Sequence, residues 1–224
     1  MTAEDPAVAK PAGAKPPGAD PDQLGGPGAL LVIVSGPSGV GKDTVIEALR
    51  QLPSAAHYHY VITCTTRPRR PYEVDGVHYH FLEPEDFRRL RDAGGLLEAN
   101  EVHGHWYGTP REDVRGALQR GDNVILKIDV QGAAVIKQKV PEALLVFLVA
   151  PSDADLFGRL QARATESADE LDRRQRNAAL ELAHQKDYDY VVVNETGQVD
   201  RTAVRVDEII RAEMAANPDR RTRV

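Results

Sequence analysis

A lysine at the end of a glycine-rich stretch is the first feature of this sequence that points to chemistry. Residues 36–43 read Gly-Pro-Ser-Gly-Val-Gly-Lys-Asp and directly follow the apolar run 29–35. This order is typical of the pattern G-x-x-x-x-G-K-[ST], in which successive backbone N–H groups turn inward around a phosphate. The helix expected from Lys42 aims the positive end of its dipole at the same anion. The loop therefore predicts a site for the phosphates of a nucleoside triphosphate, with Lys42 reaching the β- and γ-phosphates. We assign to this site Gly36, Pro37, Ser38, Gly39, Val40, Gly41, Lys42, Asp43 and Thr44.

The last position of the pattern, where Ser or Thr is usual, is Asp43. The usual hydroxyl helps to hold Mg²⁺, and Mg²⁺ also accepts carboxylate oxygens. We therefore expect Asp43 to take over this role, directly or through water, with Thr44 as the alternative ligand. The carboxylate also adds negative charge beside the phosphates, which is unfavourable unless the metal is bound.

Three arginines and a tyrosine form a second chemically dense segment, at Arg67, Arg69, Arg70 and Tyr79. Planar guanidinium groups recognise a phosphate monoester through paired hydrogen bonds, so this cluster is suited to a phosphorylated acceptor. A solvated basic turn is the alternative for such a cluster on its own. Two later segments favour the binding site, LLEANE at 96–101 and WYGT at 106–109.

The elements that must position these residues follow an alternating pattern. Continuous apolar runs, which indicate buried parallel strands, occur at 29–35, 123–129, 143–149 and 190–193. Helical patterns lie between them, so we expect an α/β fold with a doubly wound parallel sheet flanked by helices. Residues 58–107 interrupt the alternation with shorter mixed segments and are expected to form an inserted subdomain.

The bulk composition excludes several classes of protein. The 224 residues are 42% hydrophobic, which allows one sizeable globular domain. A single cysteine, Cys64, excludes an internal disulfide framework and is typical of a reducing cytoplasm. A net charge of −6 gives no overall attraction to nucleic acid. No run of apolar residues is long enough for a membrane span, so we expect a cytoplasmic protein without a membrane partner.

Both ends of the chain differ in composition from the rest. Residues 1–28 are built mainly from Pro, Ala, Gly, Lys and Asp and have almost nothing to bury. Such a segment cannot offset the entropy lost on ordering, so we expect a disordered tail. Residues 216–224 are expected to form a short polar C-terminal tail.

Several motifs in order resemble the guanylate kinase family, from about residue 31 to residue 211. They are GPSGVGK, TTR-x-x-R-x-x-E-x-DG-x-x-Y-x-F, LLE, YGT, IDVQG and VVVN. The resemblance implies a P-loop kinase core, a small mixed-β GMP-binding subdomain and a helical lid. It further implies that ATP and GMP are converted to ADP and GDP with Mg²⁺. The implied boundaries are core 29–57, 108–155 and 173–215, insert 58–107 and lid 156–172, within a domain spanning 29–215.

The resemblance implies which residues bind the acceptor phosphate. Arg67 and Arg70 would clamp it, and Tyr79 and Tyr107 would donate hydroxyl hydrogen bonds to it. These positions match the arginines and tyrosines of the family motifs.

The resemblance also implies which residues bind the guanine base. Glu98 would accept hydrogen bonds from the guanine N1–H and 2-amino group. Adenine lacks this pair of donors and would leave the carboxylate buried and unpaired. Thr63 and Thr109 match hydroxyl positions that contact the base, and Asp129 matches the position that steadies the surrounding site.

The lid contributes arginines to the expected triphosphate site. Arg159, Arg163 and Arg174 match family positions that close over the triphosphate and neutralise charge on the transferred phosphoryl group. Asn194, after the last expected strand, matches the position on the adenine side. A solvated helix face is the alternative for each arginine taken alone.

The chain departs from the family pattern at positions besides Asp43. Tyr72 stands where glycine precedes the acid of the acceptor motif, so a glycine-specific turn there must rearrange. Lys127 replaces an acid two residues before Asp129, and either changes the local charge or provides an additional phosphate contact. Alanines at 162 and 164 replace common glycines, which would stiffen the lid.

Two other functions remain open from the sequence. One is an inactive guanylate-kinase-like module that binds phosphopeptides through the acceptor subdomain. The intact glycines, Lys42 and the lid arginines argue against it. The other is a related P-loop kinase with a phosphorylated sugar as acceptor, which Glu98, Thr63 and Thr109 disfavour because they suit a base.

Overall fold

The computed structural model describes residues 28–102, 104–162 and 168–224. Apart from Gly28, the expected N-terminal tail lies outside the described residues, and so does Arg163. The side chain of Arg174 is also not described, although its backbone belongs to a helix.

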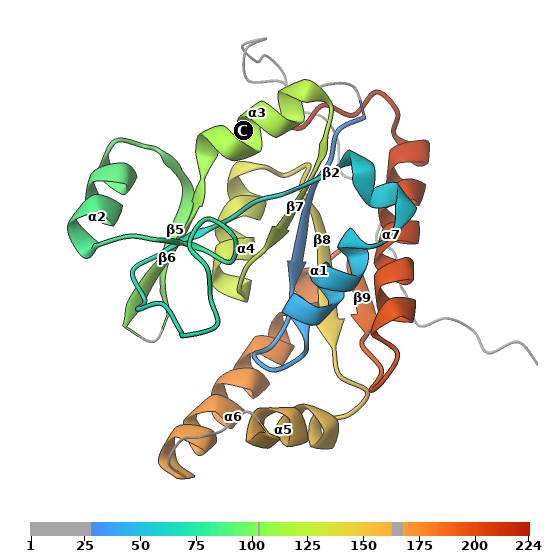
Figure 1. Ribbon diagram of the computed structural model, residues 1–224. Coiled ribbons are helices and arrows are strands. Elements are labelled where there is room, and N and C mark those ends of the chain that lie inside the picture. Colours follow the sequence, from blue (N-terminus) through green and yellow to red (C-terminus); the bar gives the residue numbers. More distant parts are fainter. Residues whose placement is uncertain (1–27, 103, 163–167) are drawn as a thin grey trace, which may run out of the picture.

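A five-stranded parallel sheet forms the centre of the molecule (Figure 1). Its strands are β1 (Leu31–Ser35), β2 (Tyr58–Tyr60), β7 (Asn123–Lys127), β8 (Leu144–Val149) and β9 (Tyr190–Val193). They lie in the order β2-β7-β1-β8-β9, and every neighbouring pair is parallel. All five residues of β1 are buried, because the strand lies in the middle of the sheet with helices on both faces. The expected doubly wound parallel sheet is confirmed.

Helices cover both faces of this sheet and complete two hydrophobic cores. Val32 and Val34 of β1 point to one face, where they pack with α1 (Lys42–Arg50) and α7 (Val199–Ala216). Leu31 and Ile33 point to the opposite face, which is covered by helices α3 (Arg111–Arg120) and α4 (Val130–Lys139). The alternation of side chains along a strand thus builds a core on each side of β1.

A second, smaller sheet lies to one side of the first (Figure 1). It contains β3 (Cys64–Thr65), β4 (His80–Phe81), β5 (Leu96–Val102) and β6 (His105–Pro110), in the order β4-β3-β6-β5. Its pairings are mixed, since β3 is parallel to β4 and antiparallel to β6. Helix α2 (Pro84–Asp92) covers it with a small core centred on the buried Phe87.

The second sheet does not begin where the expected insert begins. Residues 58–60 form β2, which pairs with β7 at the edge of the main sheet. The chain then leaves the main sheet, and β3 starts the second sheet at Cys64. At the other end β6 runs on to Pro110.

Helices α5 (Asp153–Ala162) and α6 (Ala168–Leu182) project together below the carboxyl ends of the main strands (Figure 1). They correspond to the region expected to act as a lid. A short 3₁₀ helix (Ala183–Asp187) leads from α6 to β9, and another (Pro53–His57) precedes β2. Among the described residues, no helix combines the length and apolar character needed to cross a bilayer.

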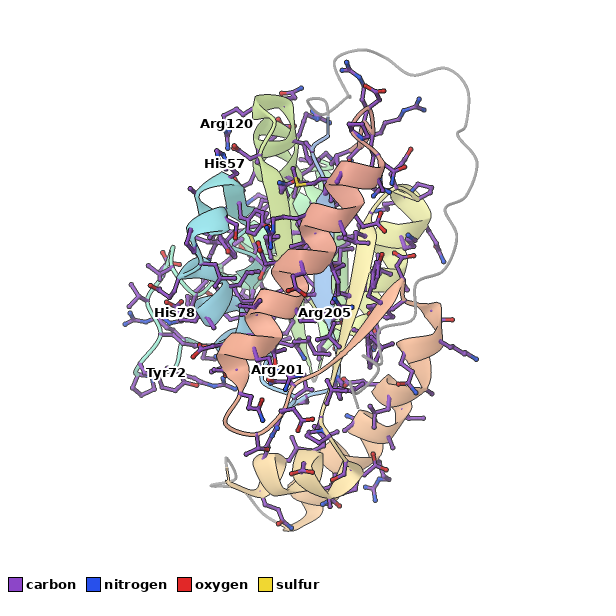
Figure 2. The ribbon with its side chains drawn as sticks, turned by 90° about the vertical axis from the view of Figure 1, so that its right-hand side faces the viewer. His57, Tyr72, His78, Arg120, Arg201 and Arg205 are labelled. Atoms are coloured by element: carbon purple, nitrogen blue, oxygen red, sulfur yellow. The ribbon has the colours of Figure 1, made fainter. Side chains whose placement is uncertain are left out.

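The C-terminal residues fold back onto the start of β1. The buried hydroxyl of Thr222 donates a 2.9 Å hydrogen bond to the Ala29 carbonyl, and the Gly28 N–H donates one of 3.0 Å to the Arg220 carbonyl. Arg220 also forms an ion pair of 2.9 Å with Glu213 on α7. Helix α7 lies along the face of the sheet that is seen in Figure 2.

Candidate active site

The glycine-rich loop lies at the carboxyl end of β1, between this central strand and α1. Crevices at the carboxyl ends of parallel strands are the usual binding sites of open α/β sheets. Two glycines are required by geometry. Gly41 has φ of 98°, and a Cβ there would lie 2.6 Å from the Asn194 side-chain nitrogen. Gly36 has φ of 144°, and a Cβ there would collide with the Leu148 carbonyl. Both positions therefore need glycine for conformation and for space.

Lys42 lies within this loop and bonds to its backbone. Its Nζ donates hydrogen bonds of 2.6 Å to the Gly36 carbonyl and 3.1 Å to the Pro37 carbonyl. Burial lowers the pKa of Lys42, and the nearby carboxylates of Glu181 and Asp43 oppose this effect. The loop therefore holds an ammonium group against its own carbonyl groups, within the segment that the sequence predicts to bind phosphate.

A carboxylate already lies against the loop. The Ser38 backbone N–H, one of the expected phosphate donors, donates a 2.8 Å hydrogen bond to Oε2 of Glu181 on α6. This carboxylate oxygen is bound to a backbone N–H that the sequence predicts to donate to a phosphate. Sequence reasoning missed Glu181, because a single glutamate on an amphipathic helix gives no signal of its own.

Arg159 and Asn194 hold the backbone of the loop. Arg159 donates hydrogen bonds of 3.1 Å to the Val40 carbonyl and 2.9 Å to the Asn194 carbonyl. The Asn194 side chain donates a 2.8 Å bond to the same Val40 carbonyl and accepts one of 3.0 Å from Thr202. In this structure Arg159 therefore braces the loop through its carbonyl groups.

Asp43 forms an ion pair with Lys127 at the start of α1. Lys127 is the last residue of β7, and its Nζ lies 5.4 Å from the centre of the Tyr79 ring. This pairing joins the two largest departures from the family pattern in one contact. Thr44, the alternative metal ligand, follows Asp43 in the same helical turn.

Glu73 orders the arginines that the sequence predicts to bind the acceptor phosphate. Arg67 donates hydrogen bonds of 2.6 and 3.0 Å to the two carboxylate oxygens of Glu73, and the Arg70 backbone N–H donates one of 2.8 Å. Burial alone would raise the pKa of Glu73, but these hydrogen bonds outweigh it and lower the pKa. Sequence reasoning assigned no role to Glu73, although its place three residues after Arg70 in the acceptor motif could have indicated one.

Aromatic rings line the same site. The Arg67 guanidinium lies 5.6 Å from the centre of the Tyr79 ring, and the centres of the Tyr79 and Tyr107 rings are 6.0 Å apart. Burial disfavours the charged form of Arg67, but hydrogen bonds with Glu73 and Tyr107 raise its pKa. The structure thus brings Arg67, Tyr79 and Tyr107 together.

Arg70 lies at the exposed side of this site. Its side chain is about half exposed, and its Nη1 donates a 3.2 Å hydrogen bond to the Tyr72 hydroxyl. Tyr72 is 69% exposed and points outward at the edge of the molecule (Figure 2). Because its ring lies in solvent, the residue does not crowd the arginine cluster.

Glu98 is a buried carboxylate held in one orientation by two neighbours. It is 4% exposed, its Oε1 accepts a 2.7 Å hydrogen bond from Thr109, and its Oε2 accepts one of 2.5 Å from Asn100. Burial raises the pKa of Glu98 to about 7, and these two hydrogen bonds oppose the effect. A Cβ at Gly132 on α4 would lie only 3.2 Å from Oε2, so the main domain closes one side of this site.

The other two residues expected at the base have different positions. Thr63 is buried beside β3, where its carbonyl accepts a 2.9 Å hydrogen bond from the His80 N–H. Asp129 caps α4, accepting hydrogen bonds of 2.7 and 3.0 Å from the backbone N–H groups of Gln131 and Gly132. Asp129 therefore fixes the start of the helix that faces Glu98.

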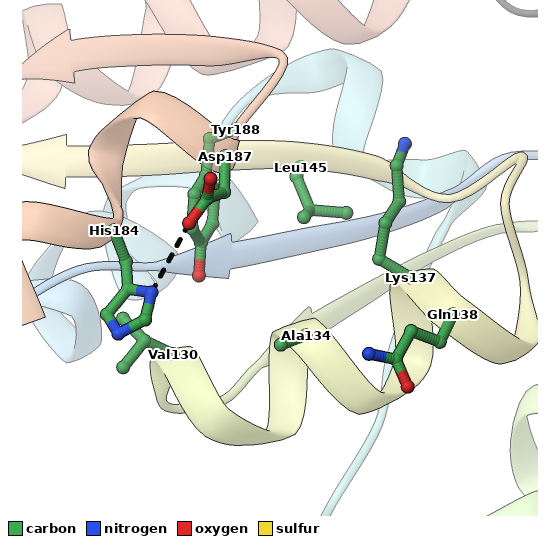
Figure 3. A pocket seen from close by; sticks show the side chains of 8 residues that line it. All are labelled: Val130, Ala134, Lys137, Gln138, Leu145, His184, Asp187 and Tyr188. Atoms are coloured by element: carbon green, nitrogen blue, oxygen red, sulfur yellow. Dashed lines mark hydrogen bonds and ion pairs between the residues drawn. The ribbon is translucent and has the colours of Figure 1, made fainter.

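A separate pocket of about 240 Å³ lies between α4 and the 3₁₀ helix that follows α6 (Figure 3). Its lining is mainly apolar, and Figure 3 shows the 3.3 Å contact between His184 and Asp187 at its edge. None of the residues expected to bind ATP or GMP lines it.

Comparisons with known proteins agree on one family. The guanylate kinase family model matches residues 29–213. A guanylate kinase of Chelativorans sp. is 42% identical over 185 residues, which cover 82% of this chain and 83% of that protein. A guanylate kinase of Mycobacterium bovis is 47% identical over 178 residues, 78% of this chain and 85% of that protein.

A solved structure extends the agreement to the fold. The crystal structure of guanylate kinase from Anaplasma phagocytophilum superposes with a TM-score of 0.67 at 30% identity. The match covers 83% of this chain and 86% of that chain. The chain belongs to the guanylate kinase family.

Proposed function

We propose that this protein transfers the γ-phosphoryl group of ATP to GMP and releases ADP and GDP. The observation that supports the proposal is the position of two clusters of cationic side chains, each a candidate anion site, at one end of the main sheet. One is the glycine-rich loop with Lys42, and the other is the arginine cluster ordered by Glu73. The contact of Lys127 with Asp43 on one side and Tyr79 on the other joins the two sites.

The donor triphosphate would lie against the loop residues 36–44. The backbone N–H groups and the dipole of α1 would stabilise its oxygens, and Lys42 would exchange its loop carbonyls for the β- and γ-phosphates. Asn194, whose side chain donates a hydrogen bond to the Val40 carbonyl, would lie on the side of the loop where the adenine of ATP binds. Arg159 and Arg163, from the segment we propose as a lid, and Arg174, which follows it, would neutralise charge on the transferred group.

The acceptor would bind with its phosphate at Arg67, Arg70, Tyr79 and Tyr107. Its guanine would face Glu98, whose carboxylate would accept hydrogen bonds from N1–H and the 2-amino group. Thr109 already fixes the Glu98 side chain, and Thr63 and Asp129 would complete the surroundings of the base. Adenine offers neither of these two donors, so binding it would leave part of the accepting capacity of the buried carboxylate unused, which is costly.

The residues present fit a magnesium ion. Mg²⁺ in phosphoryl-transfer sites is usually held by one or two carboxylates together with substrate phosphates and water, and Asp43 supplies a carboxylate at the start of α1. The ion would neutralise charge on the phosphates, held by Asp43 directly or through water.

The reaction needs no covalent intermediate and no protein base, because phosphoryl transfer depends mainly on positioning and on charge stabilisation. Lys42 and the arginines would hold the two phosphates in line, and the closed site would exclude water as a competing acceptor. We place the reaction in the cytoplasm, where ATP, Mg²⁺ and reduced thiols such as that of Cys64 occur together.

An acceptor panel tests the proposal. ADP release from ATP and Mg²⁺ would be followed with GMP, dGMP, AMP and several sugar phosphates. We expect turnover with GMP and lower activity with AMP. Faster turnover with a sugar phosphate than with GMP would indicate that a sugar phosphate is the substrate. Phosphopeptide binding without any turnover would indicate an inactive binding module.

A further inference from the structure

Lys127 occupies a position between the two anion sites. It is the last residue of β7, which pairs with β1 directly beside the strand that leads into the glycine-rich loop. Its ammonium group bonds to Asp43 next to Lys42 and lies 5.4 Å from the centre of the Tyr79 ring. One side chain therefore reaches the proposed donor site and the proposed acceptor site at once.

The ion pair with Asp43 does not account for Lys127 on its own. The Asp43 side chain is 71% exposed, and ion pairs with an exposed partner contribute little to the stability of the fold. The Lys127 side chain is 26% exposed, so its ammonium group gives up much of its hydration. The loss of hydration would be offset if the ammonium group contacts the negatively charged phosphates during the reaction.

The chemistry of an ammonium group suits contact with several anions. The ammonium group has three N–H donors, and the bond to Asp43 uses one of them. Even if a second donor points at the Tyr79 ring, one is left for a phosphate oxygen. The ion pair with Asp43 holds this group in place beside the glycine-rich loop.

We propose that Lys127 is a catalytic residue whose ammonium group contacts the acceptor phosphate and the phosphoryl group in transit. This inference rests on the proposed transfer from ATP to GMP and adds a residue to its machinery. Asp43 is then a positioning residue for Lys127 as well as a metal ligand. The two departures from the family pattern act as a unit in this arrangement.

The test compares Lys127→Met, Lys127→Arg and a control, Lys186→Met, which removes an exposed lysine outside the site. Affinities for GMP and for guanosine would be measured without ATP or Mg²⁺, by NMR titration, which reaches millimolar dissociation constants. Turnover with ATP and GMP and the thermal unfolding midpoint would be measured for each variant.

We expect Lys127→Met to raise the GMP dissociation constant about tenfold, since it removes a charge-assisted hydrogen bond. The guanosine dissociation constant should stay within about twofold, because guanosine carries no phosphate. Turnover should fall about 100-fold with Lys127→Met, recover in part with Lys127→Arg and stay unchanged with Lys186→Met.

Two results would overturn the inference. One is unchanged GMP affinity and turnover in Lys127→Met, and the other is an equal loss of affinity for GMP and guanosine. A wild-type protein without GMP-dependent turnover would contradict the proposed function instead. The comparison of GMP with guanosine would still decide whether Lys127 contacts the phosphate.

Discussion

At the scale of single residues, the proposed preference for guanine rests on Glu98. Its carboxylate is buried, its two oxygens are held by Thr109 and Asn100, and its pKa is raised to about 7. Guanine binding requires the ionised form, because only a carboxylate accepts from both the N1–H and the 2-amino group. The environment of Glu98 thus makes its charge sensitive to pH near neutrality.

GMP affinity should fall as pH drops from 8 to 5.5. Below pH 7 Glu98 becomes protonated, and affinity should decrease by up to about tenfold per pH unit. The dissociation constant of GMP would be measured by calorimetry across this range. The GMP phosphate also titrates near pH 6, so Glu98→Gln is the control. This variant should bind GMP more weakly at pH 8 and lose the steeper part of the profile. Identical pH profiles for both proteins would contradict the role of Glu98.

The same shift has a consequence for folding with the opposite sign. Because the pKa of Glu98 is raised in the folded state, its contribution favours folding at acidic pH. That contribution is lost as pH rises from the usual glutamate range through about 7. Stability and GMP affinity therefore respond to the ionisation of this residue in opposite directions.

At the scale of elements, short segments hold the phosphate-binding groups in place. The segment from Arg67 to Glu73 is a loop without helix or strand. Glu73 stabilises its conformation by accepting hydrogen bonds from the Arg67 side chain and the Arg70 backbone N–H. The loop and the second sheet together would form the proposed acceptor site.

Glu73→Gln should weaken acceptor binding without affecting the donor. An amide cannot accept from Arg67 at both positions, so the guanidinium loses its fixed orientation. We expect the KM for GMP to rise about tenfold, with the KM for ATP within about twofold of wild type. Steady-state kinetics with each substrate varied in turn would measure both. An equal rise in the two KM values would indicate general disruption of the site.

Helix α6 provides an element-scale prediction for the donor site. The Glu181 carboxylate must leave the Ser38 N–H before a phosphate oxygen can take its place. Glu181→Ala should therefore tighten ATP binding about threefold to tenfold when GMP is absent. Calorimetric titration would measure the change, with Glu85→Ala on the exposed face of α2 as control. Weaker ATP binding in Glu181→Ala would mean that this glutamate supports the loop.

Sequence patterns predicted where helices and strands lie better than they predicted which strands pair with each other. The strand predicted from the apolar run 29–35 is confirmed as Leu31–Ser35, and the helix predicted from Lys42 is confirmed as well. Both were predictable because a glycine-rich turn separates them. The segment 58–107, expected as one insert, contains strands of both sheets, since β2 belongs to the main sheet and β3 to the second. A run of strand-forming residues does not indicate which sheet each part joins.

Site contacts were predictable only where a motif contains them. Glu73 lies within the acceptor motif, so its bond to Arg67 follows a readable spacing. The contact between Asp43 and Lys127 spans 84 residues, and that between Ser38 and Glu181 spans 143. No local pattern encodes either of them. The functional assignments of the individual site residues remain predictions.

At the scale of the whole molecule, the fold brings the two proposed phosphate sites to the carboxyl end of the main sheet. The glycine-rich loop follows β1, and Lys127 ends the neighbouring β7. The loop after β3 carries the arginines and β5 carries Glu98, in the part of the chain that forms the second sheet beside the main one (Figure 1). The carboxyl ends of parallel strands lie at the same end of a sheet, so segments far apart in the sequence meet there. This arrangement is what a reaction between two phosphorylated nucleotides requires.

Transfer from ATP to GMP at the glycine-rich loop can be followed by a coupled assay of ADP release. Wild-type protein and Lys42→Met would be compared with ATP and Mg²⁺, with GMP or AMP as acceptor. We expect rapid GMP-dependent ADP release by the wild type, and a loss of at least about 100-fold in Lys42→Met. ADP release that persists in Lys42→Met, or that is equally fast with AMP, would show that the loop does not transfer phosphate specifically to GMP.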